Sequence, residues 1–115
     1  MNPRIRAAAF VISSLLVCNP GYCQSQPEMN QASQAGFEKA DAKLNATYKK
    51  LLSKLDSEGK KKLIAAERAW VAYRDAQAAF EADAQARGGS MAPLIYNQTC
   101  LELTEARIKE LASSE

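Results

Sequence analysis

The stretch from Leu63 to Phe80, LIAAERAWVAYRDAQAAF, constrains the fold more than any other part of the chain, because it combines helical spacing with the only tryptophan. Six of its residues follow one another at intervals of three or four positions: Leu63, Ala66, Trp70, Tyr73, Gln77 and Phe80. Residues at this spacing share one face of a helix, and a largely apolar face must be buried against another element. The interspersed alanines favour helix and allow neighbouring helices to approach closely. The stretch therefore predicts a long helix at the centre of the core.

Arg74 stands at the edge of this stripe, four residues after Trp70 and directly after Tyr73. An arginine in such a place can stack on an aromatic ring or reach a carboxylate. We expect Arg74 to lie at the rim of the core with a structural role, and we keep it as a candidate for contact with a partner.

The N-terminus has the pattern of a secretory signal peptide. Met1–Arg6 is short and basic, and residues 7–17 form an apolar run of 11 residues, which is too short to span a bilayer. The order Leu15–Cys18 has a weak likeness to a lipoprotein signal, but a valine directly before the cysteine is unfavourable there, so lipid anchoring is the less favoured alternative. The pattern predicts a periplasmic or secreted protein without a membrane span, in a compartment where disulfides persist.

Small residues indicate where the signal peptide is cleaved. Gly21 and Cys23 are small enough for the positions that precede a cleavage site, which places the cut before Gln24. Residues 1–23 are then the signal peptide, and residues 24–115 are long enough for one domain.

The composition of the mature part excludes several classes of function. The chain has no histidine, which removes the commonest general base, the usual serine-protease triad and most zinc sites. Of the 15 basic residues, Arg4 and Arg6 lie in the leader, which leaves 13 basic residues against 13 acidic ones. The longest basic run, Lys60–Lys62, is far short of a nucleic-acid footprint. We expect no nucleic-acid partner, no metal and no cofactor.

Capping residues indicate the boundaries of the first two helices. Ser25, with Glu28 three residues later, has the form of a capping box and predicts a helix that ends near Leu55. A compact break follows, in which Asp56 or Ser57 can cap a second helix that contains the central stretch.

The second helix is expected to end near Ala86, where the segment 87–90 breaks the pattern. Gly88 can take the left-handed conformation common after a helix, and Ser90 can cap a third helix with Pro93 in its first turn. The apolar positions of this helix are Leu94, Leu101, Ile108 and Leu111. We therefore predict an all-α fold, an antiparallel three-helix bundle built on a long helical hairpin of the first two helices, with the third packed along it.

One cluster of residues is more specific than helical periodicity requires. This cluster is RAW-x-x-YRDA at residues 68–76, and shorter pieces precede and follow it in order: Gln26, Met29–Asn30, Ala40–Asp41, Leu44–Asn45, Tyr48, Gly89–Ser90, Cys100, Leu103–Thr104, Arg107 and Glu110–Leu111. Together they cover nearly the whole mature chain and resemble the lysozyme inhibitor LprI-like N-terminal domain family. The resemblance implies an exported helical protein that blocks a muramidase by binding it.

The same resemblance bears on the cysteines. Family members commonly carry cysteines where this chain has Ala32 and Ala78. They also carry a cysteine near the start of the domain, for which Cys23 is the nearest candidate, and one that matches Cys100. If Cys23 survives cleavage, a Cys23–Cys100 disulfide would tie the first helix to the third. If it is removed, Cys100 is a lone buried thiol or a dimer link, and no histidine is present to make it a nucleophile.

Two groups of residues are candidates for a role beyond the apolar core. The first is a polar and aromatic network where the helices meet, in which Arg107 could bridge to Glu67 and fix the helix register. Its members are Asn45, Tyr48, Glu67, Trp70, Tyr73, Arg74, Thr104 and Arg107. The second is the glycine-rich turn, whose free backbone N–H groups could donate hydrogen bonds to a carboxylate of a partner. With Arg74 added, its members form the predicted partner-binding surface: Arg87, Gly88, Gly89, Ser90 and Met91.

These observations lead to one functional hypothesis and one alternative. The first is a non-enzymatic protein similar to the LprI-type inhibitors, with lysozyme or another muramidase as its partner. Catalysis by Glu67 is not expected, because no second acid stands at a suitable spacing. The alternative is a structural or adaptor module of the cell envelope that binds another protein or itself. The class of lysozyme and the oligomeric state stay open.

Overall fold

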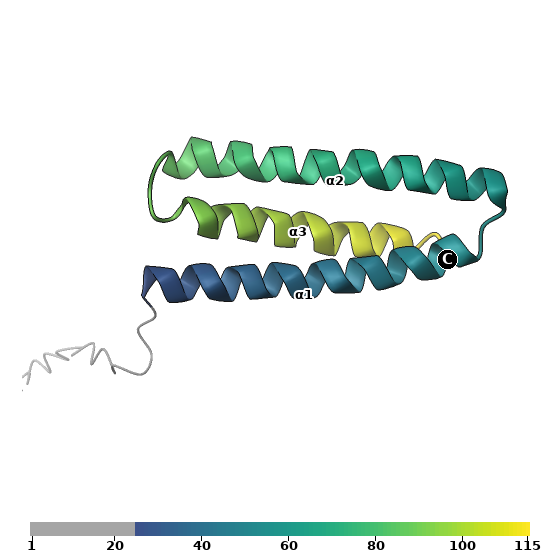
Figure 1. Ribbon diagram of the computed structural model, residues 1–115, viewed down its shortest axis with the longest axis horizontal. Coiled ribbons are helices and arrows are strands. Elements are labelled where there is room, and N and C mark those ends of the chain that lie inside the picture. The colour runs from purple at the N-terminus through teal and green to yellow at the C-terminus, as the bar shows by residue number, and fades with distance from the viewer. Residues whose placement is uncertain (1–24) are drawn as a thin grey trace, which may run out of the picture.

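The computed structural model describes residues 25–115 and contains three helices, α1 (Gln26–Ser53), α2 (Ser57–Ala86) and α3 (Ala92–Ala112) (Figure 1). The prediction of an all-α chain of three helices is confirmed. The predicted signal peptide, its cleavage site and Cys23 lie outside the described residues.

The start of α1 has the predicted capping box. The Ser25 hydroxyl accepts a hydrogen bond from the Glu28 backbone N–H at 3.4 Å, and the Glu28 carboxylate accepts one from the Ser25 N–H at 3.3 Å. Pro27 lies in the first turn, where its missing N–H costs nothing. Two donors that a helix start leaves unpaired are thus satisfied by side chains of the same segment.

Of two predictions for the turn between α2 and α3, one is confirmed and the other is wrong. Gly88 has a φ of 67°, the left-handed conformation predicted for it. Ser90 does not cap α3, because the helix begins one residue later, with Met91 at the cap position and no side-chain cap. The Ser90 carbonyl instead accepts a hydrogen bond from the Asn30 side chain at 3.3 Å. This contact ties the turn to the start of α1.

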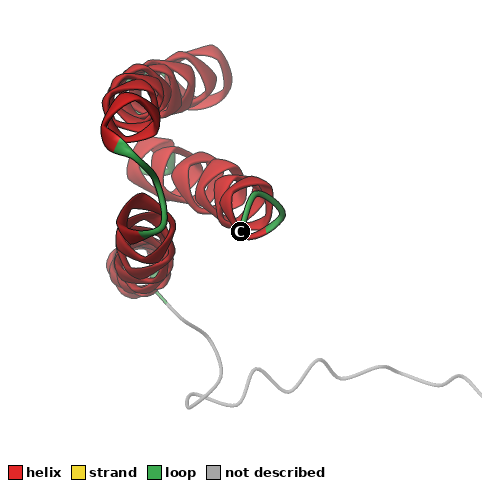
Figure 2. Cartoon of the chain, turned by 90° about the vertical axis from the view of Figure 1, so that its right-hand side faces the viewer, coloured by secondary structure: helices red, strands yellow, loops and turns green. Residues whose placement is uncertain are grey.

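The three helices are arranged with α3 between the other two (Figures 1 and 2). The short connection after α1 reverses the chain, so α2 runs antiparallel to α1 and α3, while α1 and α3 run in the same direction. The hairpin part of the prediction is therefore wrong in its packing. Helices α1 and α2 touch little, and each packs mainly against α3.

The core is small and changes character along the bundle. Leu44, Leu51 and Leu111 form its buried apolar centre, against which four half-buried side chains pack: Tyr48, Leu63, Trp70 and Ile108. The other buried side chains are mostly small: Ala40, Ala78, Ala82 and Cys100. Small side chains at a helix contact let two backbones come close, so the narrow part of the core needs little apolar volume.

The central stretch is helical as predicted, but the stripe that it buries is not the predicted one. Tyr73 and Phe80 are 54% and 63% exposed, although the spacing placed both in the core. The buried positions of this part of α2 are Arg74, Ala78 and Ala82, four residues apart. Beyond Trp70, which packs on the core, the helix is thus rotated so that small side chains are buried and Tyr73 and Phe80 are not. No helix among the described residues has the length and apolarity needed to cross a membrane.

We expect Gly88→Ala to lower the free energy of unfolding by about 1 kcal/mol, because alanine is strained at a positive φ. A Cβ at Gly88 would meet nothing within 4 Å, so no clash adds to this cost. Gly36→Ala on α1 is the matched control, since its Cβ also meets open space. It should keep or raise stability by about 0.5–1 kcal/mol. Urea unfolding followed by circular dichroism measures both, and equal effects would contradict the left-handed turn.

Candidate functional site

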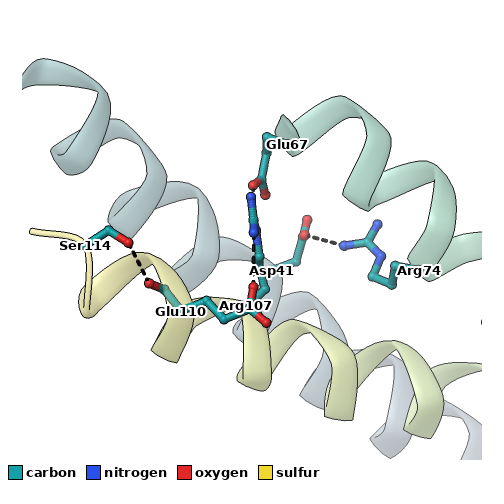
Figure 3. Close-up of polar contacts among 6 residues, drawn as sticks. All are labelled: Asp41, Glu67, Arg74, Arg107, Glu110 and Ser114. Carbon is teal, nitrogen blue, oxygen red and sulfur yellow. Dashed lines mark hydrogen bonds and ion pairs between the residues drawn. The ribbon is translucent and has the colours of Figure 1, made fainter. Parts of the chain in front are cut away.

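Arg74 is the most constrained polar residue of the bundle. It is only 7% exposed, and its Nη1 lies 3.0 Å from Asp41 Oδ1 on α1 (Figure 3). Its Nε lies 2.9 Å from Asp75 Oδ1 on α2. A buried guanidinium without a partner would be costly, and two carboxylates remove that cost. The contact with Asp41 joins α1 to α2 directly, where these helices otherwise touch little.

The same guanidinium is stacked between aromatic rings. Its Cζ atom lies 4.9 Å from the centre of the Phe37 ring and 5.3 Å from that of Trp70. Burial lowers the pKa of Arg74, but the hydrogen bonds and charges of Asp75 and Asp41 outweigh it, so the pKa lies above its usual value. Arg74 therefore carries its charge throughout the ordinary pH range. From the sequence, Arg74 could stack on an aromatic ring or reach a carboxylate, and in the structure it does both. Its expected place at the rim of the core is wrong, because the side chain is buried between α1 and α2.

A second arginine joins α3 to α2. Arg107 Nε lies 3.0 Å from Glu67 Oε2, and its Nη1 lies 3.1 Å from Glu110 Oε2 (Figure 3). Its Cζ lies 5.8 Å from the Trp70 ring centre. Trp70 thus contacts the guanidinium groups of both arginines, and one aromatic ring links the two ion-pair systems.

The structure brings together only part of the predicted network. Four of its members meet around the Trp70 ring: Glu67, Trp70, Arg74 and Arg107. Tyr48 packs on the leucine core instead. Three members stand apart from the ion pairs. Asn45 and Tyr73 are exposed, and Thr104 is fully buried, with no hydrogen-bond partner for its hydroxyl among the described residues.

The sequence reasoning missed the partners of Arg74. Three residues that surround Arg74 were not assigned to the network: Phe37, Asp41 and Asp75. A signal for Asp41 was present, because Ala40–Asp41 is one of the short pieces that carry the family resemblance. Asp75 follows Arg74 directly in sequence, and neighbours on a helix point in different directions, so periodicity alone would not pair them.

Cys100 lies at the centre of the bundle. It is 0% exposed, and no other cysteine falls within residues 25–115, so it forms no disulfide in the described part of the chain. Burial raises the pKa of its thiol, which favours the unreactive protonated form at neutral pH. Whether Cys23 pairs with it lies outside the described residues.

Of the predicted partner-binding surface, the turn at residues 87–91 is accessible to a partner and Arg74 is not. Residues 87–91 are all exposed, and Met91 is 46% exposed. Arg87 is paired with Asp83 by two hydrogen bonds of 2.9 and 2.7 Å, which lower the pKa of that carboxyl. Arg74 is buried and paired at some distance along α2, so it cannot contact a partner together with this turn.

Shallow grooves, rather than a deep pocket, mark the described surface. One groove of about 470 Å³ lies between α1 and α3, with Lys39, Lys43 and Lys109 among its lining residues. A second, of about 440 Å³, lies between α2 and α3 and includes Glu81 and Glu102. In residues 25–115, no group of three or more histidine, cysteine or acidic residues is placed to hold a metal ion. These surfaces are shaped for contact with another molecule more than for enclosing a small one.

Comparison with known proteins decides the family. The profile of the family described as lysozyme inhibitor LprI matches residues 18–111. The chain belongs to this family. The resemblance inferred from the sequence is thereby confirmed. An uncharacterized protein of Rhizobium meliloti (strain 1021) is 33% identical, and the match covers 93% of this chain and 94% of that relative. No solved structure matches the chain.

In this LprI-family chain, we expect Asp41→Ala to lower the free energy of unfolding by about 1–2 kcal/mol, because a buried guanidinium loses one of two partners. The control is Asp83→Ala, which removes a carboxylate from the exposed Arg87 and should leave stability nearly unchanged. Urea unfolding compares the two variants. Equal losses would show that Arg74 does not depend on the link to α1.

We also expect Cys100 of the LprI-family chain to resist thiol reagents. In protein that starts at Gln24, an aromatic disulfide reagent should react at least about a hundredfold more slowly with the folded protein than with the urea-unfolded protein, because reaction requires opening of the bundle. Absorbance of the released thiol measures both rates. Fast reaction of the folded protein would contradict the burial of Cys100.

Proposed function

We propose that the chain is an exported, non-enzymatic protein that blocks a muramidase by binding it. The observation that carries this proposal is membership in the lysozyme inhibitor LprI family over residues 18–111. Export rests on the leader pattern of the first 23 residues, which would deliver the mature domain to the periplasm or the medium, where enzymes that cut the cell wall act.

The polar groups of the bundle support a binding role over a catalytic one. Glu67, the carboxylate considered from the sequence as an acid, is held by Arg107 at 3.0 Å, and its side chain is largely buried. Glycoside hydrolysis uses two carboxyl groups that face the same bond from opposite sides. Glu67 is instead engaged in holding α2 to α3 through its ion pair with Arg107.

The turn at residues 87–91 is the predicted contact, and its size limits what it can do alone. A stable interface buries about 800 Å² on each partner. The turn has two large side chains, Arg87 and Met91, and the first is already paired with Asp83. A blocking surface therefore has to include neighbouring parts of α2 and α3 as well as the turn.

The proposal predicts stoichiometric inhibition. Mature protein from Gln24 onward is titrated against a chicken-type lysozyme, a goose-type lysozyme and a bacterial muramidase, with lysis of cell walls as the readout. Activity of at least one enzyme should fall in a saturable way and reach its minimum near one inhibitor per enzyme, because binding occludes the cleft.

The control for this titration is an unrelated helical protein of similar size at the same concentrations, which should not inhibit. Full lysis by all three enzymes at large excess, from protein that is helical by circular dichroism, would contradict the inhibitor function. The envelope adaptor would then be the function to test, by a search for a bound envelope protein.

A further inference from the structure

Two large aromatic side chains of α2 lie in solvent. Tyr73 is 54% exposed and Phe80 is 63% exposed. They are seven residues apart, which is two helical turns or about 10 Å along one side of the helix. A single exposed apolar residue is ordinary, but two aromatic rings on one stripe are the kind of surface that proteins bury on binding. Met91 is also exposed and lies in the turn that follows the C-terminal end of α2.

Tyr73 lines the groove between α2 and α3, and Phe80 lies two helical turns farther along the same side of α2. Tyr73, Ile95 and Leu103 give this groove apolar walls, and Gln77, Glu81 and Glu102 give it polar ones. We call the combined surface the acidic aromatic face and define it by six residues: Tyr73, Gln77, Phe80, Glu81, Glu102 and Leu103. Aromatic anchors beside a groove with a polar rim match the anatomy of protein interfaces.

The charge on this side of the bundle has one sign. Between residues 75 and 106 the only basic residue is Arg87, which is paired with Asp83. The same span holds five acidic residues, of which Asp75 is paired with Arg74 and Glu105 lines the groove between α1 and α3. The acids left on this side are Glu81, Asp83 and Glu102. The Glu81 carboxylate accepts hydrogen bonds from Gln77 at 3.1 Å and from Gln85 at 2.9 Å. Both donors are neutral, so they hold the carboxylate in place without cancelling its charge.

The neighbouring groove, along the other flank of α3, has the opposite sign. The groove between α1 and α3 includes Lys39, Lys43 and Lys109 against the single acid Glu105. The equal numbers of basic and acidic residues in the mature chain therefore describe two unlike surfaces, and not a uniform neutral one. A charged partner approaching within a Debye length of about 8 Å responds to the nearer face.

We infer that the acidic aromatic face is the surface through which the chain binds a protein with a cationic surface, namely the muramidase of the proposed function, on which this inference rests. Tyr73 and Phe80 are the apolar anchors, and Glu81 and Glu102 meet basic side chains of the enzyme. Carboxylates placed this way speed association with a cationic partner, while the two rings, once buried by the partner, slow dissociation of the complex.

A second copy of the chain fits this face less well. A two-fold dimer would place the acidic aromatic face against itself, so Glu81 and Glu102 of one protomer would oppose the same carboxylates of the other. Like charges brought together at an interface are unfavourable. A cationic partner has no such conflict.

The experiment measures binding and inhibition separately, with a chicken-type lysozyme as the basic probe. Titration calorimetry gives the affinity at low and at physiological salt, and lysis of cell walls gives inhibition. Phe80→Ala should weaken binding by about tenfold or more, because it removes an anchor. The double variant Glu81→Gln with Glu102→Gln should weaken it by about tenfold at low salt and less at high salt.

The matched control is Glu38→Gln with Glu105→Gln, which removes the same charge from exposed positions outside the acidic aromatic face and should bind as the unchanged protein does. Circular dichroism confirms that every variant is folded. Weakened binding in the face variants alone supports the inference.

Other outcomes separate the inference from the proposed function. If the protein inhibits lysozyme and the face variants inhibit equally well, the face is wrong and the function stands. If it binds without inhibiting, the function is wrong and the same variants still decide the face. Absence of binding to the basic enzyme overturns the inference, even when another muramidase is inhibited. A dimer by light scattering that Phe80→Ala dissociates would also overturn it, because the face would then be filled by a second copy.

Discussion

The buried charge of Arg74 is the constraint on which the arrangement of the helices depends. Helices α1 and α2 touch little, so the ion pair of Arg74 with Asp41, at 3.0 Å, is a main direct link between them. A guanidinium in this place must be paired, since an unpaired one would cost several kcal/mol, about 3–5 in comparable cases. Any shift of α1 along the bundle that separated Asp41 from Arg74 would carry that cost. The pair thus favours one register over its neighbours.

Trp70 extends this constraint to α3. Its ring lies against Arg74 and against Arg107, whose Nε meets Glu67 at 3.0 Å. The three helices therefore meet at one aromatic ring between two ion pairs, in a chain whose fully apolar core is only a few leucines. Small side chains elsewhere in the interior bring the helices close without adding much apolar area. The ion pairs around Trp70 therefore do more to fix the relative positions of the helices than the limited apolar core does.

Local features of this fold were predictable from sequence because they depend on near neighbours. Ser25 and Glu28 satisfy each other's backbone groups three residues apart, and Gly88 takes a conformation that its missing side chain permits. The packing was not predictable in the same way. Periodicity states which residues share a face, but not which helix covers that face, or whether any does. Tyr73 and Phe80 fit a buried stripe, yet close packing on α3 favours Ala78 and Ala82.

The buried ion pairs also determine which charges remain at the surface. Arg74 precedes a span of α2 and α3 that is rich in acids, and an exposed arginine there would reduce its negative charge. Its burial between Asp41 and Asp75 removes that positive charge from the outer face. The side of α2 that carries Tyr73 is left with Glu81 and, across the groove, Glu102. The rotation that buries the arginine is the same one that exposes the aromatic rings, so the internal network and the acidic aromatic face have a common structural cause.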